Sequence, residues 1–314
     1  MKLKNLKVLV SACGGDIGYS VGKILQESGA CKTLLGMDLS EDHAGFHVFD
    51  KCIKAPGAKD ENYISFVEEL IQNELLDFFI PISEPEIEVL MNSFESLSFK
   101  KKILMPNLTS IKVGLDKFNT FNFLKENGLK PPHTVLATSE DQAFPLILKS
   151  RTGRGSKDVY LVKNKNELLR YKDLLNDDFI FQEFIPEGEG EFTCGLYRNG
   201  EVTRSIILKR RLVGGLTGSG ETIENVKIKK YLEELAEKID LHGSINIQLR
   251  LNAGRPMVFE INPRFSSTVY FRNKLGFPDL IWCIADQLNL EVAEFTPPKA
   301  GIKFYRVGEE LIKA

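Results

Sequence analysis

The chain has 314 residues, of which 43% are hydrophobic and 27% charged, and its formal net charge at pH 7 is −2. A chain of this length and composition predicts a globular protein with two or three lobes rather than one core. The small net charge gives no reason to expect nucleic acid or an anionic membrane as a partner. No apolar run in the sequence reaches transmembrane length.

The cysteines and the N-terminus bear on the cellular compartment. The five cysteines include no Cys-x-x-Cys pair, so we expect reduced thiols in a cytoplasmic protein. The four histidines show no paired spacing, which argues against a zinc site. The basic N-terminus leads through a short apolar run into a glycine turn, which is typical of a first strand and not of a signal peptide. The oligomeric state cannot be read from the sequence, which is compatible with a homo-oligomer.

The first 107 residues alternate in the pattern of a Rossmann-like lobe. A buried strand at 6–11 runs into a glycine-rich turn, an amphipathic helix to about Ser28 and a strand that ends at Asp38. The dinucleotide fingerprint would need glycine at position 13, where Cys13 stands. A glycine-rich turn is also a common tight connection from a strand to a helix, and we favour this interpretation. The alternative is a nicotinamide-dependent oxidoreductase that uses the Gly14–Asp38 segment.

Polar side chains follow the next predicted strand, at 76–82. Ser83, Glu84 and Glu86 stand at its carboxyl end, where open α/β sheets bind ligands. They would contact a substrate there, or Ser83 would cap the following helix with the two acids in its first turn. From these residues alone the cap is the better interpretation. A last short strand is expected at 102–105.

A lysine and a glycine-rich loop characterise the second lobe, which follows a helix predicted at 108–128. An apolar strand ends in Lys149, and the basic loop after it contains Gly153, Gly155 and Ser156. The backbone N–H groups of such a loop can cradle phosphates, whereas the alternative is a basic hairpin turn. No Gly-Lys-Ser opens a helix here, so this is not a Walker loop. Because lysine is rarely buried without a partner, Lys149 favours a functional role.

Two charged runs come next. An apolar strand at 179–186 turns into an acidic, glycine-containing stretch at 187–191, and three consecutive bases occupy Lys209, Arg210 and Arg211. The acidic stretch is interpreted as a solvated loop at Glu187 and Glu189. The basic run predicts either an anion site or a solvated charged face, and the residues leave both open.

A predicted hairpin near the C-terminal end carries the strongest site signal. Apolar and polar residues alternate over 245–251, a turn follows at 252–255, and a second strand ends at Pro263. Gln248, Glu260 and Asn262 can point the same way because strand side chains alternate between faces. Three oxygen-bearing side chains on one face predict a site for a hard cation such as Mg2+. The alternative, an exposed polar face, explains Glu260 poorly because it stands in a half-buried run.

The stretch Gly-Ser-Ile-Asn-Ile-Gln, followed by Phe-Glu-Ile-Asn-Pro-Arg, resembles the ATP-grasp enzymes, and most closely the branch that includes the large subunit of carbamoyl phosphate synthetase. The resemblance implies an α/β fold with a Rossmann-like N-terminal domain and a two-subdomain ATP-grasp part of α+β character. The expected divisions are 1–107 for the first domain, 108–130 for connecting helices, 131–186 for the small subdomain with the nucleotide flap, and 187–314 for the C-terminal subdomain with the metal site.

The resemblance also implies the roles of individual residues. Arg264 and Lys149 are the implied catalytic residues, and Gln248, Glu260 and Asn262 the implied metal ligands. Glu191 matches the glutamate that binds the ribose, although the spacing keeps Glu189 as an alternative. The implied ATP-binding residues are Lys117, Lys149, Gly153, Gly155, Ser156, Gln182, Glu183, Phe184, Ile185, Glu191, Lys209, Gln248 and Glu260. Candidate substrate contacts are Ser83, Glu84, Glu86, Arg210, Ser266 and Ser267.

The chemistry implied is that of an ATP-dependent carboxylate–amine or carboxylate–thiol ligase. ATP and Mg2+, or Mn2+ in its place, are the implied cofactors, and the partners are a small-molecule carboxylate and an amine. The carboxylate attacks the γ-phosphate to give an acylphosphate and ADP, and the nucleophile then releases phosphate. The nicotinamide-dependent oxidoreductase and a non-catalytic nucleotide-binding module are the alternatives. The identity of the carboxylate and the number of metal ions are open.

Overall fold

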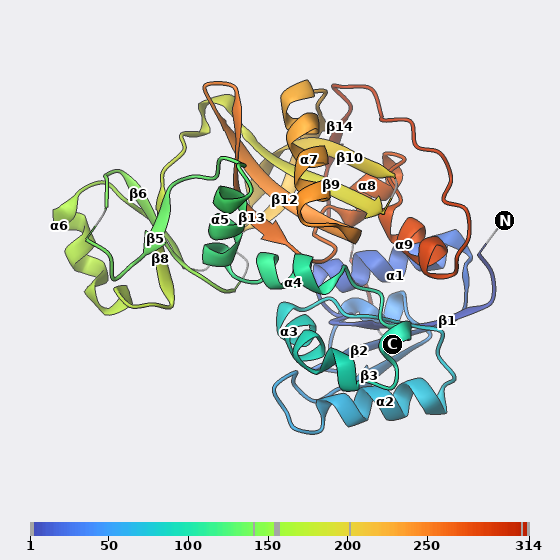
Figure 1. The fold of residues 1–314 in the computed structure, drawn as a ribbon. Helices are drawn as coiled ribbons and strands as arrows, with labels where there is room; N and C mark the ends of the chain where they lie inside the picture. The colour runs from blue at the N-terminus through green and yellow to red at the C-terminus, as the bar shows by residue number, and fades with distance from the viewer. Residues whose placement is uncertain (1–2, 141, 154–157, 201, 309, 313–314) are drawn as a thin grey trace.

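Three β-sheets organise the chain in a computed structural model that describes residues 3–312 except 141, 154–157, 201 and 309. Figure 1 shows the small sheet standing apart at one end, while the other two lie one above the other with helix α1 between them. The mixed α/β fold confirms the predicted fold class. No helix within the described ranges combines the length and the apolar character that a membrane span requires.

The first sheet is parallel and has the strand order β3-β2-β1-β4. Its strands are β1 (Leu6–Ser11), β2 (Cys31–Asp38), β3 (Lys51–Lys54) and β4 (Phe78–Ile80). Val8 and Val10 pack on the side of α1 (Asp16–Ser28), whereas Leu9 packs on the side of α2 (Tyr63–Asn73) and α3 (Glu84–Ser93). Both faces are therefore covered, which explains the almost continuous apolar run of β1.

Two local predictions in this region are wrong. The strand expected at 102–105 is reduced to a single parallel bridge between Phe79 and Ile103, since Lys100–Lys102 form a 3-10 turn and Pro106 cannot donate to a ladder. The single helix expected at 108–128 is two helices, α4 (Leu108–Gly114) and α5 (Lys117–Glu126). The break lies at Asp116, whose carboxylate accepts the N–H groups of Phe118 and Asn119 and so caps α5.

The second sheet is antiparallel, with the order β5-β8-β6-β7. It comprises β5 (Thr134–Leu136), β6 (Leu146–Ser150), β7 (Val159–Val162) and β8 (Phe179–Glu183), and α6 (Lys165–Leu168) with a 3-10 turn (Leu169–Leu174) lies against it. Its small core is built from Ala137, Leu146, Leu148, Val162, Leu168 and Phe181. The strand pair that flanks the predicted flap is therefore present.

The third sheet has six antiparallel strands in the order β13-β12-β9-β10-β11-β14. The strands are β9 (Glu191–Asn199), β10 (Thr203–Val213), β11 (Leu216–Thr222), β12 (His242–Asn252), β13 (Arg255–Asn262) and β14 (Lys303–Tyr305). Helix α7 (Val226–Lys238) covers one face with Ile228, Leu232 and Leu235. Helices α8 (Val269–Lys274) and α9 (Asp279–Gln287) cover the other, where the core continues to α1.

The predicted hairpin is confirmed as β12 and β13. Its register places Asn246 opposite Asn262 and Gln248 opposite Glu260, and it shifts by one residue just beyond Gln248. Cross-strand partners share a face of a sheet, so all four polar side chains project on the same side. The division points expected after 107, 130 and 186 fall between elements of different sheets; as domain limits they stay predictions.

Candidate nucleotide and metal site

The three side chains expected to bind a cation meet in one hydrogen-bonded cluster. The Asn262 amide donates to Glu260 Oε1 over 3.1 Å, while its Oδ1 accepts from the Gln248 amide over 2.9 Å. A fourth member, Asn246, donates to the same Oδ1 over 3.2 Å and is buried. Asn246 escaped the sequence prediction, although its position two residues before Gln248 on the same strand face was a usable signal.

Lys149 reaches this cluster from the small sheet. Its ammonium group donates to Gln182 Oε1 over 2.8 Å and to the main-chain oxygen of Phe259 over 3.2 Å, which places it beside Glu260. Burial lowers the pKa of Lys149 to about 7, against an opposing effect of Glu260. A buried lysine near neutral pKa can change its charge when an anion arrives.

The hinge between the small and the large sheet is held by its backbone. The Glu183 N–H donates to the His133 carbonyl over 2.8 Å, and the exposed Glu183 carboxylate accepts the His133 N–H over 3.0 Å. Phe184 is half-buried and Ile185 buried, and the Ile185 carbonyl accepts from Arg250 over 2.8 Å. Gln182 is buried and donates to Thr134. The predicted adenine hinge thus comprises the end of β8 and the two residues that follow it.

Glu191 lies between two arginines at the start of β9. One of its oxygens accepts from Arg210 over 2.7 Å and the other from Arg250 over 2.7 Å. Burial alone would raise the pKa of Glu191, but the two guanidinium groups outweigh it and hold that pKa below its ordinary value. Arg210 also donates to Gln248 over 2.6 Å, so the predicted ribose ligand and the predicted metal ligands form one network.

Arg250 was missed by the sequence analysis, where it was one polar residue in an alternating strand. It binds Glu191, the Ile185 carbonyl and the exposed Glu187 carboxylate. Glu189, the alternative ribose ligand, is also exposed and accepts the Gly254 N–H over 3.2 Å at the tip of the hairpin. Both side chains are exposed, as the interpretation of a solvated loop predicts, and their contacts also tie the acidic stretch to the β12–β13 hairpin.

The flap residues are placed only in part. Lys117, at the start of α5, donates to the Gly153 carbonyl over 3.0 Å, and Gly153 has a left-handed φ of 95°. Gly155 and Ser156 lie outside the described residues. Lys209 is half-buried on β10, and its side chain passes so close to Gly190 that a Cβ there would lie 2.5 Å from it.

Arg264 joins the hairpin to the first lobe. Its guanidinium donates to Glu84 over 2.8 Å and to the Phe265 carbonyl over 3.0 Å, and both members of the ion pair are largely buried. Glu84 is thereby brought to the site at the first turn of α3. Ser83 and Glu86 instead form the helix cap: Glu86 accepts from the Ser83 hydroxyl over 2.6 Å, and from Ser11 and Tyr63 as well.

Ser266 belongs to a buried group of side chains that contacts Asn246. We call Asn246, Gln248, Glu260 and Asn262 together the amide cluster. The Ser266 hydroxyl donates to Asn246 over 2.9 Å and accepts from Arg272 over 3.0 Å. Arg272 is fully buried and pairs with Asp279 over 2.7 Å, so this buried group carries its own compensating charge. Ser267 contacts Arg306 through its carbonyl. The side chain of Ser266 is therefore engaged by the protein and supports Asn246.

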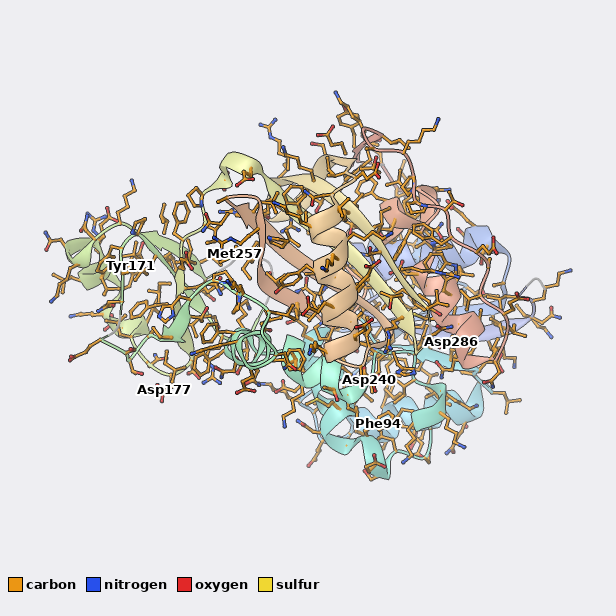
Figure 2. All side chains as sticks on the ribbon, turned by 45° about the horizontal axis from the view of Figure 1, so that its top comes forward. Phe94, Tyr171, Asp177, Asp240, Met257 and Asp286 are labelled. Atoms are coloured by element: carbon orange, nitrogen blue, oxygen red, sulfur yellow. The ribbon has the colours of Figure 1, made fainter. Side chains whose placement is uncertain are left out.

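A cavity of about 380 Å³ adjoins Arg264 between the first lobe and the large sheet. It is lined mainly by apolar side chains, including Phe265, with Phe94 on one side and Asp286 of α9 on the other. Figure 2 labels these last two residues on either side of the junction between the lobes. The cavity offers an apolar surface beside the buried ion pair of Arg264.

The Gly14–Asp38 segment does not present a free dinucleotide site. The Asp38 carboxylate accepts the Gly14 N–H over 3.0 Å, and the ring of His43 packs on Gly14 so closely that a Cβ there would lie 2.6 Å from Cγ. The turn N–H that would meet a pyrophosphate is therefore already bonded, and the oxidoreductase alternative is not favoured.

Comparison with known proteins finds a matching domain family and several distant relatives. Residues 115–268 match the ATP-grasp domain family. An uncharacterized protein of Mycoplasma genitalium is 27% identical over 130 residues, which are 39% of this chain, so the chain spans less than half, 45%, of that relative. The tyramine–L-glutamate ligase of Methanocaldococcus jannaschii is 23% identical over 245 residues. The matched region covers 76% of this chain and 71% of the ligase.

Two further matches concern the branch and the fold. The carbamoyl phosphate synthase large chain of Halobacterium salinarum is 25% identical over 51% of this chain and 17% of its own length. The solved structure of N5-carboxyaminoimidazole synthetase from Staphylococcus aureus complexed with ADP has a TM-score of 0.75 and 17% identity, and it shares 93% of this chain and 80% of its own. At this identity the structure shows a common fold alone.

Proposed function

Because residues 115–268 belong to the ATP-grasp family, we propose that the whole chain is an ATP-dependent carboxylate–amine ligase that forms ADP and phosphate through an acylphosphate. The observation that carries this proposal is the contact of Lys149 with β13. The amino group of Lys149, on the small sheet, touches the strand that bears Glu260 and Asn262, as a phosphate chain held between the two would require.

The residues of the cluster fit a magnesium ion. Glu260 contributes a carboxylate, while Asn262 and Gln248 contribute amide oxygens, and hard cations prefer such oxygen donors. When bound, Mg2+ would neutralise charge on the β- and γ-phosphates. The protein would bind the rest: Lys149 and Lys117 the phosphates, the hinge at 182–185 the adenine, and Glu191 the ribose. Arg210, which bonds both Glu191 and Gln248, would hold the ribose ligand and the metal ligands at a fixed distance from each other.

The chemistry needs positioning more than covalent participation. A substrate carboxylate oxygen attacks the γ-phosphorus, and the bond to the β-phosphate oxygen breaks to release ADP. The amine nitrogen then attacks the acyl carbon, loses a proton, and expels phosphate. Arg264 stands two residues after Asn262, and we propose that its planar guanidinium stabilises the negative charge on the transferred phosphoryl group. Glu84 holds that guanidinium in place from the first lobe.

The substrate class proposed is an amino-acid carboxylate with an organic amine. Support comes from the tyramine–L-glutamate ligase, which shares 76% of this chain. We also propose the division of the chain after 107, 130 and 186, and a cytoplasmic enzyme, since all five cysteines lack a disulfide.

A screen of carboxylates and amines for ADP formation tests the proposal, starting with L-glutamate, other L-amino acids and tyramine. With ATP and the right acid but no amine, added hydroxylamine should give a hydroxamate together with ADP. Arg264→Ala should keep much of its ATP binding and lose the hydroxamate. Pyrophosphate in place of ADP would overturn the acylphosphate route. ATP binding without turnover by any pair would favour the non-catalytic alternative.

A further inference from the structure

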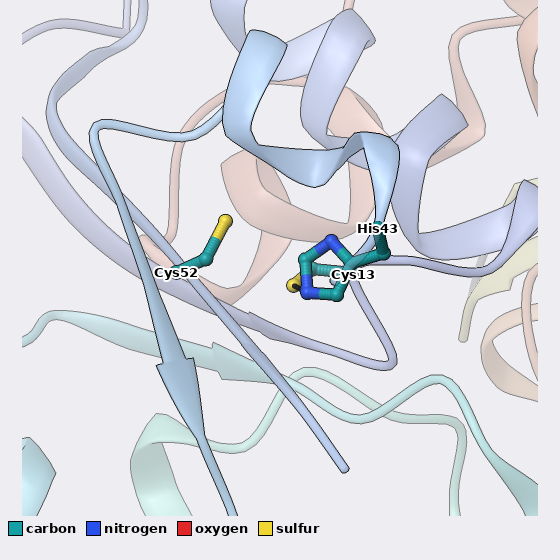
Figure 3. A group of neighbouring side chains, drawn as sticks. All are labelled: Cys13, His43 and Cys52. Atoms are coloured by element: carbon teal, nitrogen blue, oxygen red, sulfur yellow. Dashed lines mark hydrogen bonds between the residues drawn. The ribbon is translucent and has the colours of Figure 1, made fainter. Parts of the chain in front are cut away.

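Three side chains with metal-binding atoms meet in the first lobe, away from the amide cluster. Cys13 follows β1, His43 lies in the loop after β2, and Cys52 is on β3; their sulfur and nitrogen atoms all lie within 4.8 Å of one another. Figure 3 shows the three side chains converging from these separate segments. Cys13 is fully buried, whereas His43 and Cys52 are half-buried, which leaves an approach from solvent.

The spacing of the three atoms suits a tetrahedral cation. Cys13 Sγ lies 3.7 Å from His43 Nε2, and a metal with bonds of about 2.3 Å to sulfur and about 2.0 Å to nitrogen separates such a pair by roughly 3.5 Å. Two thiolates and an imidazole are a donor set that zinc accepts, and three protein ligands leave one tetrahedral position open.

The strand order argues against a disulfide between the two cysteines. Strand β2 lies between β1 and β3, with Cys52 opposite Gly36 on one side and the Cys13 N–H bonded to Met37 on the other. Two strand spacings put the α-carbons roughly 9–10 Å apart, beyond the limit of about 7 Å for a disulfide. The sulfurs approach only because Gly36 has no side chain; a Cβ there would lie 2.7 Å from Cys13 Sγ.

The electrostatics argue against a reactive thiol. Burial, with Cys52 and Asp38 nearby, raises the pKa of the Cys13 thiol, so without a cation it stays protonated and is a poor nucleophile. A bound dication would reverse this balance and favour the thiolate. Loading must also remove the proton from His43 Nε2, because His43 Nδ1 accepts the Gly45 N–H over 3.0 Å and the neutral ring then carries its proton on Nε2.

We propose that Cys13, His43 and Cys52 bind one zinc-like divalent cation, independently of the magnesium that ATP requires. Binding releases the two thiol protons and moves the imidazole proton from Nε2 to Nδ1. The Gly45 N–H then loses its acceptor, so the loop at 43–45 changes conformation on loading. The site joins the turn after the carboxyl end of β1 to β3, across β2.

The test uses the full chain, stripped of metal with a chelator under reducing conditions and titrated with Co2+ and with Zn2+. The wild type should take up one Co2+ per chain and show a thiolate-to-cobalt charge-transfer absorption that Zn2+ removes. Cys52→Ser and His43→Gln, at half-buried positions, should bind at least about tenfold more weakly. Cys31→Ser is the matched control, since Cys31 is half-buried in the same sheet but outside the cluster, and it should bind as the wild type does.

Three results would overturn the proposal. One is the absence of the charge-transfer absorption in the reduced wild type. Another is equal Co2+ affinity of wild type and Cys52→Ser. The third is a Cys13–Cys52 disulfide, seen as the loss of two hydrogen atoms by mass spectrometry in protein that binds no Co2+ when reduced. Glu260→Gln should leave the Co2+ absorption unchanged, which separates this site from the nucleotide site.

Discussion

Raising the pH above neutrality should weaken ATP binding through Lys149. Burial holds its pKa at about 7 instead of the ordinary 10.5. The amine is therefore largely neutral above that pH in the unbound protein, while bound phosphates require it charged. ATP binding should take up a proton at Lys149 in this range, because the phosphates of ATP are themselves fully ionised there.

The magnitude follows from the size of the shift. One pKa unit corresponds to about 1.4 kcal/mol, so the depression of the Lys149 pKa amounts to roughly 5 kcal/mol against the charged form. The Kd for ATP should rise about tenfold per pH unit above 7, up to the pKa of the complex. The same shift acts on stability with a defined sign. The folded chain binds fewer protons than the unfolded chain between about pH 7 and 10.5, so the free energy of unfolding rises with pH there.

Calorimetry of Mg-ATP binding at about pH 7.5 and about pH 9, in buffers of different ionisation enthalpy, measures both the Kd and the proton uptake. Lys149→Arg is the matched control because a guanidinium keeps its charge across this range, so its Kd should be nearly constant. A wild-type Kd that is flat over this range, with no proton uptake, would refute the reasoning.

Three other perturbations have defined outcomes. Glu260→Gln should fold with a melting temperature near that of the wild type yet form ADP at least about a hundredfold more slowly, because a neutral amide holds Mg2+ weakly; wild-type turnover would remove Glu260 from the site. ATP should raise the melting temperature far more than NAD at equal concentration, and the reverse order would move the nucleotide to the first lobe. Asp279→Asn should lower the free energy of unfolding by about 3–5 kcal/mol, since it leaves Arg272 buried and unpaired. Urea unfolding measures this loss, with Glu27→Gln as the control because it breaks the exposed pair with Lys274. The control should lose at most about 1 kcal/mol of unfolding free energy. Equal losses in the two variants would show that burial does not decide the strength of these ion pairs.

The sequence by itself determined the elements whose signal is local. Period-two alternation predicted the hairpin that carries Gln248, Glu260 and Asn262, and the structure places the three together. A lysine on an apolar strand identified Lys149, which is buried. The resemblance and the α/β fold followed from the same motifs: residues 115–268 match the ATP-grasp domain family, and the fold is confirmed. The predicted helix boundaries were wrong where a single residue decides them. Asp116 caps a new helix inside a stretch that is helical on both sides.

Only the tertiary structure decided which groups face one another. Strand alternation states the face on which Glu191 lies, but not that Arg210 and Arg250 reach it from two neighbouring strands. Arg264 and Glu84 are 180 positions apart, and their ion pair forms because the first lobe packs on the large sheet. The histidine spacing argued against a zinc site and the cysteines indicated free thiols, yet Cys13, His43 and Cys52 converge from three separate segments. Spacing along the chain reports metal ligands only when they share one element; ligands from separate strands are brought together by the pairing of the sheet and the gap that Gly36 leaves in it.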